Sequence, residues 1–150
     1  MFKEYNEVFN NPYEWEMDRD YPALEFHFYD EENSKFEVWF DEEIGSKYYP
    51  KKIQEIINKE DGGWLFSFAK NGSTNKQESN AFRVFATLKE IMLKHKNKIK
   101  KAPFILFSGI SSEKGRISLY RKLGKQMRRT LRYMNYEEVD EGGKTFFILY

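Results

Sequence analysis

One segment, residues 102–131 (APFILFSGISSEKGRISLYRKLGKQMRRTL), constrains the fold more than any other part of the chain. Residues 104–107 are apolar at every position, which predicts a strand buried on both faces of a sheet. The Gly/Ser turn 109–112 follows and can supply the N-cap of a basic amphipathic helix over about 113–132. A buried strand that leads into a helix N-terminus gathers backbone N–H groups, which bind anions. We therefore expect strands with covering helices, and a candidate site at this turn.

The rest of the chain contains five further apolar segments with strand character and two with helical spacing. Aromatic and β-branched residues mark the strands, and polar turns separate them. Apolar residues at i, i+3 and i+4 mark the helices. The motif Asp140-Glu141-Gly142-Gly143 is a hairpin signature between the last two strands. The strands are expected at residues 23–29, 35–40, 64–69, 136–139 and 145–150, and the helices at 51–59 and 81–96.

The resulting order, β-β-(α)-β-α-β-α-β-β, predicts a single domain of the α/β (α+β) class over residues 1–150. Its mixed, mostly antiparallel sheet would be flanked by helices. Residues 23–69 would supply antiparallel strands, and residues 80–150 a helix–strand–helix–hairpin half. Residues 1–21 would form an N-terminal arm, with a short helix or irregular segment around residues 2–9. Acidic residues alternate with Trp15 and Met17 later in the arm, which leaves a short edge strand open there.

Composition excludes several classes of site. The chain has no cysteine, so it has no disulfide, no thiolate nucleophile and no cysteine-based metal site. Neither His27 nor His95 has a partner at ligand spacing, so no metal site is expected. No run approaches the ~20 apolar residues of a membrane span, and the N-terminus lacks an apolar leader core. We expect a cytoplasmic protein. The carboxylates at 30–32 and 41–43 are expected to be solvated in turns.

The charge is strongly asymmetric along the chain. Residues 1–75 carry 17 acidic and 8 basic side chains, and residues 76–150 carry 7 acidic and 17 basic ones. Such polarity is compatible with an anion-binding face, with attraction between the two halves, and with solvated helices. The basic segment Lys94 to Arg132 is therefore a candidate for tracking nucleic-acid phosphates.

Residues 119–124 (LYRKLG) resemble the L-Y-x-K-L-G-F signature on the last helix of GNAT-type N-acetyltransferases, and the element order from Trp64 onward follows that fold. The resemblance implies acetyl-coenzyme A as cofactor and Tyr120 as general acid toward the coenzyme A thiolate. The family's pyrophosphate loop, R/Q-x-x-G-x-G/A, is not matched. The corresponding residues 70–80 contain one glycine without that spacing, and Lys125 follows Gly124 where the family has Phe.

A second resemblance involves residues 80–87 (NAFRVFAT) together with Phe107-Ser108, Gly115-Arg116 and Leu119-Tyr120. These residues are similar to small uncharacterised proteins of tailed bacteriophages. The similarity implies a viral protein that acts in the cytoplasm of a bacterial host, with no assigned activity.

Arg116 and Tyr120 lie one helical turn apart near the start of the predicted helix 113–132. A guanidinium and a helix N-terminus both favour a phosphate or a carboxylate. In the alternative, Arg116 is solvated, Tyr120 belongs to the core and the nearby serines cap the helix. Arg83, with Asn80, is either a second anion contact or simply an exposed helical position. The candidate anion-binding residues are Ser108, Ser111, Ser112, Arg116, Asn80 and Arg83, and Tyr120 is catalytic only in an acyltransferase.

Three functions follow. Because the cofactor loop is not matched, the sequence favours a non-catalytic binding or inhibitor protein on an acetyltransferase-like scaffold. Such a protein would bind a protein partner or a small anionic ligand, and it would need no cofactor. The first alternative is a divergent acetyl-coenzyme A-dependent N-acyltransferase. The second is a nucleic-acid-binding protein that uses the basic C-terminal half.

Overall fold

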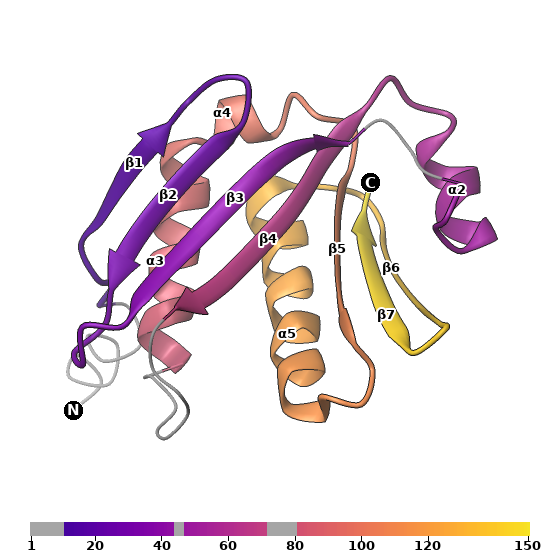
Figure 1. The fold of residues 1–150 in the computed structure, drawn as a ribbon. Helices are drawn as coiled ribbons and strands as arrows, with labels where there is room; N and C mark the ends of the chain where they lie inside the picture. The colour runs from indigo at the N-terminus through magenta and orange to yellow at the C-terminus, as the bar shows by residue number, and fades with distance from the viewer. Residues whose placement is uncertain (1–10, 44–46, 72–80) are drawn as a thin grey trace.

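A seven-stranded sheet in the order β1-β2-β3-β4-β5-β7-β6 runs through the computed structural model (Figure 1), which describes residues 11–43, 47–71 and 81–150. All neighbouring strands are antiparallel except β4 and β5, which are parallel. The predicted fold class is thereby confirmed. The strands are β1 Trp15–Arg19, β2 Leu24–Tyr29, β3 Lys35–Glu43, β4 Gly63–Asn71, β5 Ile105–Ile110, β6 Tyr136–Glu141 and β7 Lys144–Leu149; the helices are α2 Lys51–Ile57, α3 Ala81–Lys94, α4 Lys96–Ile99 and α5 Lys114–Leu131.

The N-terminal arm contains a strand. β1 pairs with β2 at the edge of the sheet, with Trp15 opposite Phe28 and Met17 opposite Phe26. The edge-strand alternative is therefore confirmed for this part of the arm. The helix or irregular segment expected around residues 2–9 lies outside the described residues.

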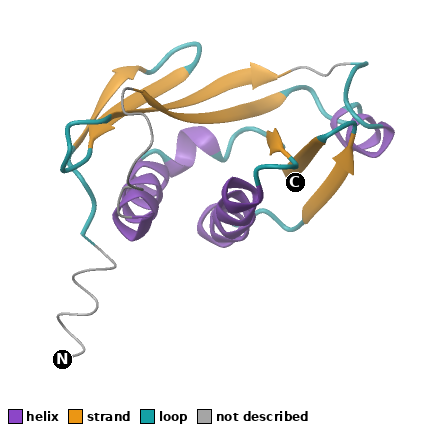
Figure 2. Ribbon diagram, turned by 60° about the horizontal axis from the view of Figure 1, so that its bottom comes forward, coloured by secondary structure: helices purple, strands orange, loops and turns teal. Residues whose placement is uncertain are grey.

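Strand alternation explains why α3 and α5 cover one face of the sheet. Figure 2 shows both helices on the same side of the strands, with α2 apart from them. Phe26 and Phe28 of β2 and Val38 of β3 are at most 1% exposed and belong to the core beneath α3 and α5. The alternate residues of β2 and β3 point to the other face, which is partly exposed. One-sided burial of this kind is the usual result of period-2 patterning in antiparallel strands.

The first half of β5 is buried on both faces, as its apolar run predicts. Ile105 and Phe107 belong to the core under α3 and α5. Phe104 and Leu106 belong to a second cluster, which includes Ile53 of α2. α2 therefore covers the opposite face of the sheet around β5 and β7, and helices protect the central parallel strand from both sides.

The helix predicted over 81–96 is shorter in the structure. α3 ends at Lys94, and His95 takes a non-helical conformation before the short α4 begins. The His95 ring packs against Trp15 and Phe26, with ring centroids 5.7 and 5.0 Å away. This packing holds the chain at the break, and the next residues form the short α4.

One of the turn carboxylates expected to be solvated is buried. Asp30 is 7% exposed, and its Oδ1 accepts backbone N–H groups of Glu32 and Ser34 at 2.9 Å each. The Nζ of Lys70 lies 3.8 Å from its other oxygen. Asp41 is exposed as predicted, but residues 41–43 lie at the end of β3 and not in a turn. Asp30 therefore organises the turn between β2 and β3 from inside it.

Gly124 of α5 packs against the ring of Tyr136 of β6, which gives a first prediction. A Cβ at this position would lie 2.7 Å from Cε2 of Tyr136 and 3.3 Å from Cζ of Phe107. Alanine improves helix propensity by about 1 kcal/mol, but displacing packed rings costs about 1–3 kcal/mol. We expect Gly124→Ala to lower the free energy of unfolding, measured by urea denaturation.

Gly115 is the matched control in the same helix. Nothing lies within 4 Å of its Cβ position. Gly115→Ala should therefore raise the free energy of unfolding by about 0.5–1 kcal/mol. Equal stabilisation by both substitutions would show that Gly124 is not a close-packing position.

Candidate functional site

β4 and β5 separate after two residue pairs, and their separation opens a slot in the sheet. They pair at Trp64–Ile105 and Leu65–Leu106 and diverge beyond, so that α5 is visible between them in Figure 1. We call this opening the β4–β5 slot; its volume is about 250 Å³. It is lined by Leu65, Phe66, Ser67 and Phe68 of β4, Phe107 and Ser108 of β5, and Tyr120 of α5.

The two strands keep their partners on their other sides. β4 pairs with β3 over its whole length, and β5 pairs with β7 from Ile105 to Ile110. On the slot side, β4 has no partner strand from Phe66 onward and β5 has none from Phe107 onward. Strand edges carry rows of backbone N–H and C=O groups. Both walls of the slot can therefore donate and accept hydrogen bonds to an extended ligand.

Aromatic rings line the slot on the side of α5. The ring of Phe107 lies 5.6 Å from that of Phe66 and 5.9 Å from that of Tyr120, both edge-to-face. The Tyr120 ring also meets Phe147 at 6.2 Å. This packing fixes the ring of Tyr120 beneath the diverging strands.

The hydroxyl of Tyr120 reaches solvent although the residue is 8% exposed. Within the described part of the chain, this hydroxyl has no hydrogen-bond partner. Every fully buried side-chain N or O atom in that part has a partner, so the hydroxyl is not fully buried. Tyr120 is one of the residues that line the slot. Burial raises the pKa of Tyr120, and the charge of Arg116 opposes this only in part. The hydroxyl therefore stays protonated at neutral pH and can donate.

Two serines line the slot from the opposite face of the sheet. Ser67 alternates with Phe66 and Phe68, which pack in the core under α3 and α5, and Ser108 follows Phe107 of the same core. Successive side chains of a strand point to opposite faces. Ser67 and Ser108 therefore lie on the α2 side and Tyr120 on the α5 side, so the slot passes through the plane of the sheet.

Of the site residues predicted from the sequence, Tyr120 and Ser108 both line the slot. Ser67 was not predicted, although a lone serine within the apolar run WLFSFA was a signal for it. The other described candidates lie outside the slot lining.

The serines after β5 do not cap α5. The N-cap residue is Glu113, and its side chain makes no capping hydrogen bond, so the prediction of a serine cap was wrong. Ser111 instead donates to Asp140 and shares a hydrogen bond with Thr145, which fixes the turn to the β6–β7 hairpin. Hydrogen bonds from Thr145 and Ser111 hold the pKa of Asp140 below its ordinary value. Ser112 is exposed.

The predicted arginines have local roles. Arg116 is exposed, and its guanidinium lies 3.9 Å from the carboxylate of Glu113. Arg83 donates to the backbone oxygen of Asn11 at 2.9 Å and stacks on the ring of Tyr13 at 4.0 Å. It thereby holds the N-terminal segment against α3. Asn80 lies outside the described residues.

Comparison with known proteins gives no match for this chain. No protein-family model, no curated protein and no solved structure matches it. Residues 11–43, 47–71 and 81–150 contain no group of three His, Asp or Glu side chains placed to hold a metal ion. No helix in these ranges is long and apolar enough to cross a membrane. The slot offers hydroxyls, strand-edge backbone groups and aromatic rings.

Proposed function

We propose that the protein binds a small ligand with an extended, amide-bearing chain in the β4–β5 slot, on an acetyltransferase-like scaffold. The separation of β4 from β5 is the observation that carries the proposal, since it leaves two strand edges facing one another. Amide groups of an extended ligand can pair with such edges as an added strand does. The pantetheine arm of coenzyme A is a chain of this class. The sequence implied coenzyme A only for the acyltransferase alternative, and the slot extends that expectation to the binding protein.

The side chains of the slot suit the same ligand. The rings of Phe66, Phe68 and Phe107 provide apolar contact for methylene groups, and the hydroxyls at Ser67 and Ser108 provide hydrogen bonds. About 250 Å³ is smaller than the roughly 300–1,000 Å³ of a site that encloses a drug-sized ligand. The slot would therefore hold the thin arm and leave the bulky end of the ligand outside.

N-acyl transfer is the second candidate function, and the position of Tyr120 favours it. An amine that attacks a bound thioester displaces a thiolate, which must gain a proton when the C–S bond breaks. The protonated hydroxyl of Tyr120, which lines the slot, could supply that proton. The proton that the amine loses as the amide forms would pass to solvent, and solvent would return one to Tyr120. Because the slot passes through the sheet, the amine could approach from the face opposite Tyr120. Coenzyme A would supply the thioester chemistry when bound.

Thermal melts with coenzyme A test the binding. A ligand at 100 times its dissociation constant adds about 2.7 kcal/mol, which should raise the Tm of a chain of this size by about 5–10 °C. Ser108→Trp should abolish this shift, because the indole would fill the slot. Ser112→Trp places the same side chain on the exposed turn outside the slot lining and should keep the shift. No shift in the wild type at millimolar coenzyme A would refute the proposal.

Tyr120→Phe separates binding from transfer. The ring and its packing remain, so the Tm shift with acetyl-coenzyme A should persist. Transfer to a panel of amines, followed by thiol release, should fall about 100-fold or more if Tyr120 is the general acid. A wild type that binds acetyl-coenzyme A without turnover would assign binding as the function.

The remaining expectations stay predictions. These are the bacteriophage origin, the cytoplasmic location, an inhibitory role and the binding of nucleic acid by the basic helices. A gel-shift titration with duplex and single-stranded DNA tests the last, because phosphate binding must weaken steeply as salt is raised.

A further inference from the structure

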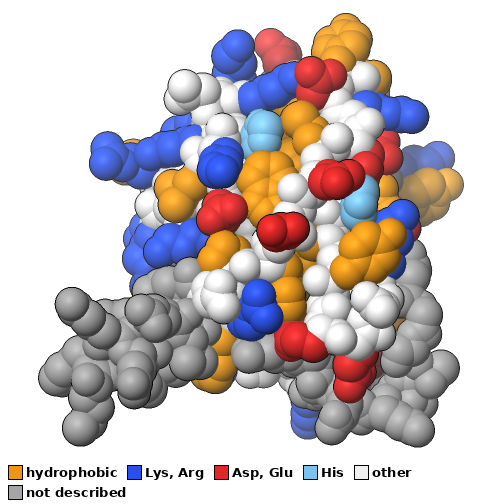
Figure 3. All heavy atoms as spheres, turned by 90° about the vertical axis from the view of Figure 1, so that its left-hand side faces the viewer, with side chains coloured by type: hydrophobic (Ala, Val, Ile, Leu, Met, Phe, Trp, Pro, Cys, Tyr) orange, Lys and Arg blue, Asp and Glu red, His pale blue; other side chains and the backbone are white. Residues whose placement is uncertain are grey.

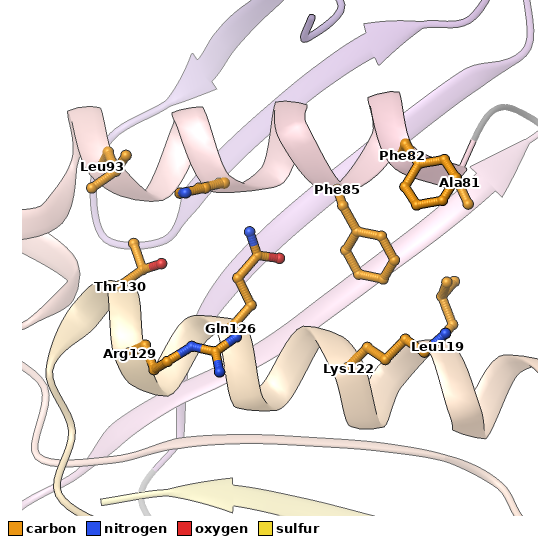
Figure 4. A pocket seen from close by; sticks show the side chains of 10 residues that line it. Ala81, Phe82, Phe85, Leu93, Leu119, Lys122, Gln126, Arg129 and Thr130 are labelled. Atoms are coloured by element: carbon orange, nitrogen blue, oxygen red, sulfur yellow. The ribbon is translucent and has the colours of Figure 1, made fainter. Parts of the chain in front are cut away.

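A groove of about 650 Å³ lies between α3 and α5, separate from the β4–β5 slot. Figure 4 shows Phe85 of α3 and Gln126 of α5 pointing toward one another across it. No residue that lines this groove also lines the slot. We call it the α3–α5 groove.

Apolar side chains form much of the groove surface. Phe82 and Leu93 are 53% and 49% exposed, and Phe85 and Leu119 are half-buried. On α3 these residues form a second stripe beside the core stripe of Val84, Leu88 and Ile91. A groove-lining stripe of exposed apolar residues between two helices is typical of a surface that binds another molecule.

Basic side chains flank the apolar ones. Lys89, Lys122 and Arg129 line the groove, and none of them forms an ion pair with a described residue. α3 and α5 together contain ten Lys and Arg residues. Their single acid, Glu90, accepts a hydrogen bond from the indole of Trp15. Figure 3 views the molecule from the edge of the sheet that β1 forms. Lys and Arg side chains gather on one side of this view, and acidic and basic side chains are mixed beside them. The charge that complements this groove is negative.

We propose that the α3–α5 groove binds an acidic amphipathic helix of a partner protein. Phe82 and Leu93 are eleven positions apart on α3, which is about 17 Å along the helix axis and matches roughly three turns of a bound helix. The partner's apolar residues would contact Phe82, Phe85 and Leu93, and its carboxylates would meet Lys122 and Arg129. A nucleic-acid backbone would satisfy the cations but would leave Leu93 and Leu119 uncovered, so the lining favours protein.

Two synthetic peptides of about 14 residues test the proposal by fluorescence anisotropy. Both carry leucines at i, i+3, i+4 and i+7; one has glutamates and the other lysines at the remaining positions. The acidic peptide should bind at least about tenfold more tightly than the basic one, and its binding should weaken with salt. Lys122→Glu with Arg129→Glu should reduce its affinity about tenfold or more.

Control variants distinguish groove binding from general charge effects. Lys51→Glu on α2 makes the same kind of charge reversal on the other face of the sheet, and it should leave the affinity within about twofold. Ser108→Trp should leave peptide binding unchanged, which separates this proposal from binding in the slot. Leu93→Asp should weaken acidic-peptide binding without loss of the folded circular-dichroism spectrum.

Three results would overturn the proposal. Equal affinity for both peptides, or no effect of the double charge reversal, would remove the electrostatic argument. Tighter binding of a DNA oligonucleotide that the double variant abolishes would assign the groove to phosphates. Self-association in sedimentation that the double variant abolishes, and that excludes the peptide, would assign it to a second copy of the chain.

Discussion

Phe107→Ala is expected to lower the free energy of unfolding by about 3–5 kcal/mol, because a fully buried ring leaves a cavity that the core cannot refill. Phe107 is 1% exposed and belongs to the core under α3 and α5. Its ring stacks on Phe147 at 5.0 Å and meets Phe66 and Tyr120 edge-to-face at 5.6 and 5.9 Å. A domain is stable by about 5–15 kcal/mol in total, so this one substitution should remove a large fraction of the stability.

Urea denaturation monitored by circular dichroism measures the effect. Phe82→Ala is the matched control, since it removes the same atoms from a side chain that is 53% exposed. That change should cost no more than about 1 kcal/mol. A Phe107→Ala variant as stable as Phe82→Ala would contradict the packing described for β5. Because Phe107 also lines the slot, the Phe107→Ala variant should in addition lose the Tm shift with coenzyme A.

Asp30→Ala is expected to cost about 2–4 kcal/mol, because its carboxylate accepts hydrogen bonds from two backbone N–H groups in a buried turn. Without the side chain, the N–H groups of Glu32 and Ser34 lose this acceptor, and Ser34 is itself 5% exposed. The turn also places Asn33 in the left-handed region at φ 64°, which the surrounding hydrogen bonds hold. Thermal and urea denaturation would both report the loss.

Asp41→Ala provides the comparison for Asp30. Asp41 is exposed on β3, and its removal should change the free energy of unfolding by less than about 0.5 kcal/mol. Asp30→Asn should be intermediate, because an amide oxygen can still accept these hydrogen bonds but carries no charge. Equal stability of Asp30→Ala and Asp41→Ala would mean that the buried carboxylate does not organise the turn.

Much of the fold could be predicted because its patterns are local. Alternating apolar residues in 24–28 and 36–40 fixed the face that each strand buries, and the register confirms this with Phe26 opposite Val38. Gly142 and Gly143 adopt φ values of +62° and +80°, as the two central residues of a tight hairpin turn require. The apolar run 104–107 likewise predicted burial of β5 on both faces.

The site depends on contacts between residues far apart in the chain, so less of it could be predicted. The separation of β4 from β5 depends on how Phe66, Phe107 and Tyr120 pack together, and no sequence spacing records that. Which carboxylate of Asp30-Glu31-Glu32 is buried depends on the path of the turn, since all three are equally polar. Several residues near Gly109 could cap a helix, but the side chain of Ser111 donates its hydrogen bond to Asp140 of β6 instead.

The separation of β4 from β5 also divides the sheet into two segments, each built from consecutive strands of the chain. β1–β4 come from residues 15–71 and β5–β7 from residues 105–149, and two residue pairs join them. Every other strand pairing is made within one of these two segments. The junction between the two segments has fewer paired residues than any other strand pairing of the sheet, so it is the pairing expected to open first. A ligand bound between Ser67 and Ser108 would link the two segments of the sheet and make the chain unfold as one unit.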